Sequence, residues 1–182
     1  MSKIGMQVPS VTFRVRVRDD AVGGDNPFRW QDMSTDDFFK GKKVVVFSLP
    51  GAFTPVCSTY QLPGFENNAQ DFYDKGIDDI YCISVNDSFV MNAWAKHHNI
   101  DKVKIIPDGN GEFTRKMGML VEKNNLGFGY RSWRYAALID NCKIIESFVE
   151  PGFEDNCEDD PYEMTSPQII LEYLKENEKM AV

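Results

Sequence analysis

A short, mainly apolar run, KVVVFSL at 43–49, constrains the fold more than any other feature of the sequence. Consecutive β-branched residues of this kind are typical of a strand buried on both faces of a sheet. Pro50 and Gly51 end the strand. The stretch from Cys57 to Lys75 then has helical spacing, with an early bend expected at Pro63-Gly64. Its candidate inner face consists of Tyr60, Phe65, Ala69, Phe72 and Tyr73. A buried strand that leads into a helix indicates an α/β fold.

An outer strand and a short helix are predicted ahead of the buried strand. Residues 11–18 alternate with a period of two, so their arginines should form the solvated face of a strand. Residues 23–27, GGDNP, form a turn cluster. Ser34 and Asp37 resemble a capping box with Asp in place of Glu, which predicts a short helix through Lys40.

The remaining elements follow in the order strand, helix, strand, hairpin and helix. We predict strands at 80–85, 103–106, 135–139 and 144–149, and helices at 87–98 and 166–176. Asp140-Asn141 would make the hairpin turn, and Pro167 suits the first position of the last helix. This order predicts a mixed central sheet with helices on both faces, its parallel part connected by right-handed crossovers. The expected fold class is therefore α/β, a thioredoxin-like sandwich, in a single domain over residues 1–182.

Composition excludes several classes of function. The 182 residues are 42% hydrophobic and 26% charged, as in soluble globular proteins. No stretch approaches the roughly 20 apolar residues of a membrane helix. The N-terminus lacks the apolar region of a secretory signal, so we expect a cytoplasmic protein. A net charge of −8 argues against a nucleic-acid partner.

The cysteines and histidines do not form a metal-binding pattern. There is no C-x-x-C, and no Cys/His cluster has zinc spacing. The adjacent His97 and His98 lie near the end of a predicted helix, where they should interact with the dipole's negative end. We therefore expect no metal, and a reducing compartment would keep the cysteines as thiols.

The stretch that can carry chemistry is PGAFTPVCS at 50–58. Cys57 falls near a helix N-terminus, where free N–H groups and the helix dipole stabilise a thiolate, the reactive form. Pro50 and Pro55 stiffen the loop, and the Thr54 hydroxyl can fold back over the first turn. The dipole alone is too weak to ionise the thiol fully, so a further cation or hydrogen-bond donor must come from elsewhere in the chain. Alternatively, Thr54 and Ser58 are ordinary helix caps and Cys57 is a small buried residue.

The same stretch resembles the peroxiredoxin active-site pattern P-x-x-x-T-x-x-C, in the PGAFTP form of the type II, five-like subfamily. Further segments with this likeness are Ile80–Asp87 with Phe89-Val-Met, GYRSWRY at 129–135, and Val149-Glu-Pro151. The likeness runs from Gly5 to Leu174. Over this range the chain resembles the peroxiredoxin domain of bacterial glutaredoxin-linked members. It implies a thiol peroxidase that needs no cofactor.

Catalytic roles come with that resemblance. It implies Cys57 as nucleophile, Arg134 as the cation beside it, Thr54 as a hydrogen-bond donor to the peroxide's leaving oxygen, and Pro50 as a shield against water. Arg131 either supports this site from behind or forms a surface ion pair.

The reducing half of the cycle stays open on sequence grounds. Glu163 occupies the position where some five-like members carry a resolving cysteine. We expect Cys157 to be an exposed loop residue, Cys82 a core residue and Cys142 a residue without a role. Two alternatives stay open: Cys82 as a resolving cysteine, at a spacing that the resemblance allows, and Cys157 as one if its loop moves. Glutathione or a glutaredoxin is then the expected reductant, with thioredoxin and an intramolecular disulfide as the alternative. The resemblance also implies a homodimer, and a non-enzymatic peroxide sensor or chaperone is the rival function.

Overall fold

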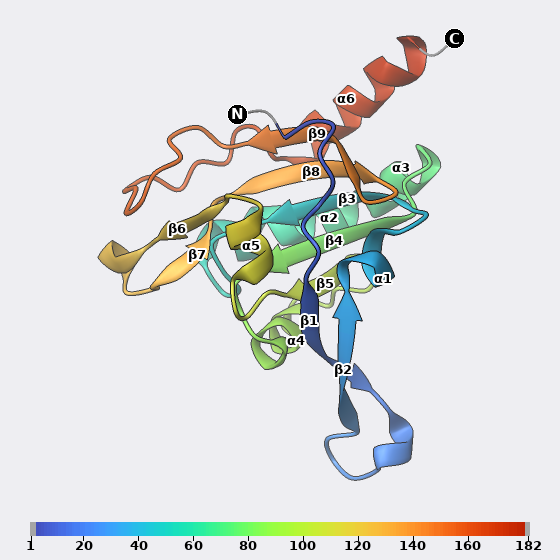
Figure 1. Cartoon of the computed structure of the whole chain (residues 1–182), viewed down its shortest axis with the longest axis vertical. Coiled ribbons are helices and arrows are strands. Elements are labelled where there is room, and N and C mark those ends of the chain that lie inside the picture. The colour runs from blue at the N-terminus through green and yellow to red at the C-terminus, as the bar shows by residue number, and fades with distance from the viewer. Residues whose placement is uncertain (1–2, 181–182) are drawn as a thin grey trace.

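A computed structural model of the chain describes residues 3–180 and contains a five-stranded central sheet (Figure 1). The strands are β3 (Lys43–Ser48), β4 (Asp79–Ser84), β5 (Lys104–Pro107), β8 (Tyr135–Asp140) and β9 (Lys143–Val149), in the spatial order β5-β4-β3-β8-β9. Strands β3, β4 and β5 are parallel, whereas β8 runs antiparallel to both β3 and β9. The predicted mixed sheet is confirmed, with the KVVVFSL strand at its centre.

Helices cover both faces of this sheet, as predicted. On one face lie α2 (Leu62–Asn67), α3 (Ala69–Asp74), α4 (Ser88–His97) and α6 (Pro167–Met180). On the other lie α1 (Thr35–Phe39), α5 (Glu112–Lys116) and strand β1 (Thr12–Arg18). The period of two in β3 divides its side chains between the layers: Val45 and Phe47 face the first, and Val44 and Val46 the second.

Strand β1 pairs with β2 (Phe28–Ser34) in a hairpin that projects from the body of the molecule (Figure 1). The predicted turn cluster lies in its connection, beside the 3-10 helix η1 (Asp20–Val22). Strand β2 was not predicted, although Phe28 and Trp30 alternate in the manner of a strand. The capping box is confirmed, because Ser34 N donates to Asp37 Oδ2 at 2.7 Å and Asp37 N donates to Ser34 Oγ at 3.2 Å.

Two further connections determine where the last third of the chain runs. Strands β6 (Leu120–Glu122) and β7 (Tyr130–Ser132) form a small hairpin around the 3-10 helix η3 (Asn124–Leu126). This hairpin and α5 were not predicted. The β8–β9 turn places Asn141 and Cys142 at φ 46° and 66°, as a two-residue primed turn requires. Helix α6 begins at Pro167 as predicted and runs past Glu176 to Met180.

The helix after the PGAFTPVCS loop differs from its prediction. After two α-helical residues at 55–56 it passes into a π turn, η2 (Cys57–Gln61), and it is interrupted again at Asn68 between α2 and α3. Pro63 lacks an N–H, so the regular bond to residue 59 cannot form, and a π turn accommodates this. The turn carries an extra residue, which rotates Tyr60 outward to 61% exposure and turns Gln61 inward. The prediction that Tyr60 lies on the inner face was therefore wrong.

Within residues 3–180, no helix has both the length and the apolar character needed to cross a membrane. The same residues hold no group of three or more His, Cys, Asp or Glu side chains arranged to bind a metal ion.

Candidate active site

Strand β3 delivers the chain into a tight loop that positions Cys57. Pro50 and Gly51 are buried directly after the strand, and Phe53 adopts a left-handed φ of 63° that few non-glycine residues tolerate. Thr54 O accepts from Ser58 N at 3.0 Å, which starts the helical segment. Cys57 thus lies in the first turn, fully buried, where backbone N–H groups lack intrahelical acceptors. The positive end of the helix dipole therefore faces the sulfur.

The cation that this thiol needs is supplied by Arg134, between β7 and β8. Its Nη1 lies 3.5 Å from Cys57 Sγ, and the arginine is only 1% exposed. Burial by itself would lower the pKa of Arg134, but the Cys57 thiolate and the Asp160 carboxylate raise it. The guanidinium therefore stays charged although it lies inside the protein.

Thr54 and Pro50 belong to the loop that leads to Cys57. Thr54 Oγ1 donates its one hydrogen to Gly51 O at 2.7 Å, so the prediction that this hydroxyl donates to a peroxide oxygen was wrong. Its lone pairs remain to accept a further hydrogen bond. Pro50 O accepts from Arg131 Nη1 at 3.4 Å. Of the residues named from the sequence, Arg134 is in direct contact with the Cys57 sulfur, and Thr54 and Pro50 lie in the loop that precedes Cys57.

Arg131 is held by backbone carbonyls rather than by a carboxylate. Its Nε donates to Phe128 O at 3.1 Å, and no ion pair to Arg131 forms among the described residues. The alternative of a surface ion pair was therefore wrong. Burial lowers the pKa of Arg131, and the Cys57 thiolate opposes that shift. Arg131 is thus a second, half-buried positive charge near the sulfur.

Several contacts of Arg134 were missed by sequence reasoning. Gln61 Oε1 accepts from Nη1, Pro161 O accepts from Nε at 3.0 Å, and the Tyr162 ring lies 5.7 Å from the guanidinium carbon. Asp160 Oδ1 lies 2.5 Å from Nη2. Gln61 is fully buried, and its Nε2 has no hydrogen-bond partner within residues 3–180. The only feature of the sequence that could have indicated the inward position of Gln61 was the helix break expected at Pro63.

Comparison with known proteins agrees with this geometry. The Redoxin family matches residues 3–163. A peroxiredoxin from Rhizobium etli is 64% identical over 169 residues, covering 93% of this chain and 94% of that protein. The chain belongs to the peroxiredoxin family. A hybrid peroxiredoxin from Haemophilus influenzae is 47% identical over 93% of this chain and 65% of its own length. The crystal structure of the Plasmodium falciparum antioxidant protein, a 1-Cys peroxiredoxin, has a TM-score of 0.88 at 37% identity, covering 95% of this chain and 99% of that one.

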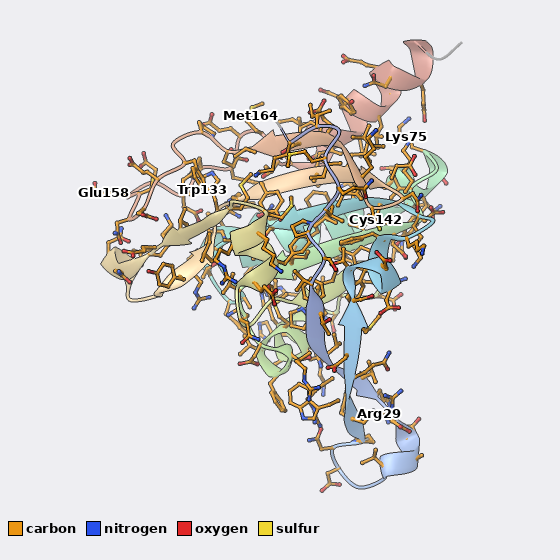
Figure 2. All side chains as sticks on the ribbon, in the orientation of Figure 1. Arg29, Lys75, Trp133, Cys142, Glu158 and Met164 are labelled. Atoms are coloured by element: carbon orange, nitrogen blue, oxygen red, sulfur yellow. The ribbon has the colours of Figure 1, made fainter. Side chains whose placement is uncertain are left out.

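The chain is thus a thiol peroxidase, an oxidoreductase, with the PGAFTP motif of the type II, five-like peroxiredoxins. Its other three cysteines differ in environment. Cys82 is fully buried in β4, and its pKa is raised by burial first and by the Cys57 thiolate second. This confirms Cys82 as a core residue. Cys142 is partly exposed in the β8–β9 turn (Figure 2), where burial and Asp36 raise its pKa.

The prediction that Cys157 is an exposed loop residue was wrong. Its side chain is 7% exposed and packs with Val121 and Trp133. Its carbonyl accepts from Lys123 Nζ at 3.1 Å. Acidic neighbours in the sequence indicated a solvated loop, but the chain folds back here against the β6–β7 hairpin. Figure 2 shows Trp133 and Glu158 on this side of the molecule.

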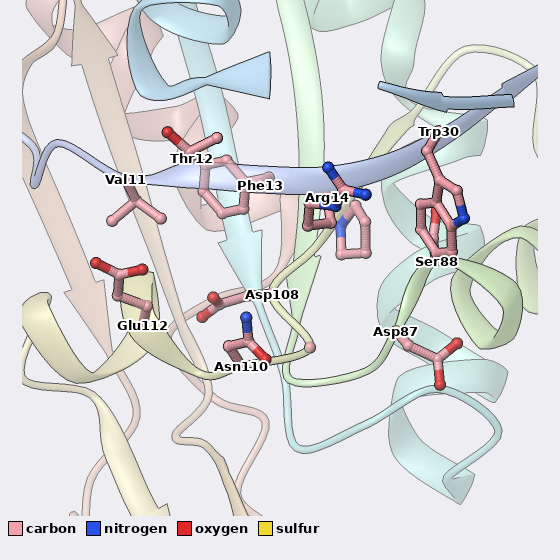
Figure 3. Close-up of a pocket in the computed structure, with 12 residues that line it drawn as sticks. Val11, Thr12, Phe13, Arg14, Trp30, Asp87, Ser88, Asp108, Asn110 and Glu112 are labelled. Carbon is pink, nitrogen blue, oxygen red and sulfur yellow. The ribbon is translucent and has the colours of Figure 1, made fainter. Parts of the chain in front are cut away.

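A separate pocket of about 220 Å³ lies between β1 and the loops after β4 and β5 (Figure 3). Two of its carboxylates already have structural partners. Asp108 accepts from Phe113 N, Thr114 N and Thr114 Oγ1, and Asp87 caps α4 through Val90 N. Cys57 does not line this pocket, and the pocket is not part of the candidate active site.

Proposed function

We propose that this peroxiredoxin reduces hydrogen peroxide and alkyl hydroperoxides through a sulfenic acid on Cys57. The thiolate attacks one peroxide oxygen, the S–O bond forms as the O–O bond breaks, and the leaving oxygen takes up a proton. The products are Cys57 sulfenic acid and water or an alcohol. The contact of 3.5 Å between Arg134 Nη1 and Cys57 Sγ is the observation that carries this proposal, because a buried thiolate requires such a partner.

Each neighbour has a role in this step. Negative charge develops on the leaving oxygen, and Arg134 and the Cys57 N–H stabilise it by hydrogen bonds. Thr54 Oγ1, whose hydrogen is given to Gly51 O, accepts from the O–H of the hydroperoxide. Pro50 is buried at the end of β3 and keeps bulk water from the sulfur.

For the reducing half we propose glutathione or a glutaredoxin in the cytoplasm. Two thiols return the sulfenic acid to the thiol, releasing water and leaving a disulfide between them. The raised pKa of Cys82 supports a one-cysteine cycle, because resolution needs a thiolate. Thioredoxin acting on a disulfide between Cys57 and Cys157 is the alternative, and it requires the buried Cys157 to leave its packing.

Intact mass after a peroxide pulse tests this cycle, with a sulfenate trap present or absent. We expect a trapped adduct on Cys57 and no loss of two hydrogens. Loss of two hydrogens would mean a disulfide, and peptide mapping would identify its partner.

Cys57→Ser should abolish turnover, while Arg134→Gln and Thr54→Val should slow it greatly. An active Cys57→Ser protein would contradict the mechanism, and oxidation without turnover by any thiol would favour a peroxide sensor or chaperone.

We also propose a homodimer that uses surfaces beside the active-site loop. Phe53 in that loop and Phe89 at the start of α4 are 53% and 55% exposed. Large exposed aromatic side chains of this kind are enriched at protein interfaces. Light scattering of the reduced protein would give the mass directly, and Phe53→Ser should shift it toward the monomer.

A further inference from the structure

Asp160 is the one carboxylate that the described residues bring to Arg134. It belongs to the loop 151–166, which joins β9 to α6 and carries a run of acidic residues. Its side chain is 43% exposed, whereas the arginine that it contacts is 1% exposed. A groove of about 520 Å³ on the same loop is lined by Asp160 together with Cys157 and Asp159. Asp160 therefore stands between solvent and the buried guanidinium.

The guanidinium donors of Arg134 are almost fully used. Nε donates to Pro161 O, and Nη1 donates to Cys57 Sγ and Gln61 Oε1. Nη2 donates to Asp160 Oδ1, and its second hydrogen has no partner among the described residues. A planar guanidinium whose three nitrogens are all hydrogen-bonded in this way is fixed in one orientation. Asp160 is the only one of these partners that is both anionic and in contact with water.

The loop does not depend on Asp160 for its own position. The buried Glu150 carboxylate accepts from Glu163 N at 2.9 Å, from Met164 N and Thr165 N at 2.9 Å, and from Thr165 Oγ1 at 2.8 Å. At the other end, Asn156 N donates to Glu122 O at 2.8 Å. Removing the Asp160 side chain therefore leaves the loop in place and frees Nη2.

We infer that Asp160 is a positioning residue for the peroxidase reaction: it holds the Arg134 guanidinium so that Nη1 faces Cys57 and the free Nη2 hydrogen can reach a peroxide oxygen. The inference rests on the proposed function, in which Arg134 assists attack by Cys57. Asp160 acts through Arg134 and touches neither the sulfur nor the substrate.

This role has two opposing electrostatic consequences. Asp160 orients the guanidinium, which speeds the attack, but its negative charge also competes with the thiolate for the same cation. Replacing the carboxylate with an amide keeps an oxygen acceptor and removes that competition. Among the described residues, the other charged or titratable groups around Cys57, Arg134 and Asp160 include Arg131, Cys82, Glu150, Cys157, Asp159, Tyr162 and Glu163.

The test compares Asp160→Ala, Asp160→Asn and the matched control Asp159→Asn in the full chain. The rate constant for Cys57 oxidation by hydrogen peroxide is measured by stopped flow at a pH where the thiolate is fully formed. We expect Asp160→Ala to be slower by roughly tenfold or more, since small errors of position at a reacting centre have effects of that order. Asp160→Asn should be slowed less, and Asp159→Asn should match the wild type.

The pH midpoint of the thiolate's ultraviolet absorbance separates positioning from simple loosening of the fold. In Asp160→Asn the midpoint should move to lower pH although oxidation is slower, because one anion beside Arg134 is gone. Loosening would release Arg134 and move the midpoint upward, which would overturn the inference, as would an Asp160→Ala protein that reacts at the wild-type rate. If Asp160→Ala does not fold, Asp160→Asn is judged against Asp159→Asn. A wild-type Cys57 that does not react with peroxide would instead defeat the proposed function.

Discussion

Gly51 shows how closely the active-site loop approaches its neighbours. A Cβ at this position would lie 2.5 Å from Arg131 Nη1, closer than side-chain carbons come to other atoms. The atom in the way is the end of a flexible side chain, so Gly51→Ala should displace Arg131 at a cost within about 1 kcal/mol of unfolding free energy. The displaced Arg131 guanidinium loses its hydrogen bond to Pro50 O and moves away from the Cys57 thiolate.

We therefore expect Gly51→Ala to lower the second-order rate constant with hydrogen peroxide several-fold while its urea midpoint changes little. Arg131→Ala should show a similar loss. The double variant should be no slower than either single one, because both changes remove the same contact. A Gly51→Ala protein with wild-type kinetics would mean that Arg131 has no part in the reaction.

How far individual residues could be predicted depended on how local their contacts are. Cys57, Thr54 and Pro50 lie within one nine-residue motif, so the sequence could name them together. Asp160 could not be found in this way, because it is one of several acids in an irregular loop. Only the folded chain selects which of them meets Arg134. Gln61 was hidden by the π turn, which changes the side of the helix that each residue faces.

Most elements with continuous apolar or alternating patterns were predicted to within a few residues, β2 being the exception, whereas most short elements without a capping signal were not. Strands β6 and β7 have three residues each and α5 has five, so they contain less than two periods of any pattern. Their stability comes from tertiary contacts that a sequence pattern does not contain. The loop 151–166 depends most on such tertiary contacts, because the buried carboxylate of Glu150 holds the second half of the loop in place by hydrogen bonds.

The carboxylate of Glu150 gives a prediction at this scale. Glu150→Gln places an amide NH₂ group among donors that now bond to Glu150. Leaving buried donors unpaired should lower the unfolding free energy by about 1–3 kcal/mol, and the loop should become a site of protease cleavage. Urea unfolding and limited proteolysis would measure both effects. The control is Glu154→Gln on the exposed part of the loop, and equal midpoints for the two variants would contradict this role.

Over the whole molecule, the reactive cysteine and a stabilising ion cluster lie at opposite ends of the parallel strands of the central sheet. Cys57 follows the carboxyl end of β3, whereas an ion cluster lies at the opposite edge, where the parallel strands begin. There Asp79 contacts Lys42 Nζ at 2.9 Å and Lys104 Nζ at 2.5 Å, and accepts from Tyr81 Oη at 3.1 Å. This single carboxylate joins the starts of β3, β4 and β5.

Stability and activity should therefore respond separately to Asp79. Burial would raise the pKa of this carboxyl, but the hydrogen bonds from Lys104 and Lys42 lower it overall. A depressed folded-state pKa stabilises the protein above the unfolded value of about 4, and this contribution is lost as pH falls through the folded value. Asp79→Asn should thus lose about 1–2 kcal/mol at pH ~7, a modest effect because both lysines are partly exposed. Urea unfolding at pH ~7 and again below pH ~3 should show the difference from wild type shrinking with acid, with Asp25→Asn as the exposed control. Peroxidase activity should be unchanged, and a difference that persists undiminished in acid would show that Asp79 stabilises the sheet by packing rather than by charge.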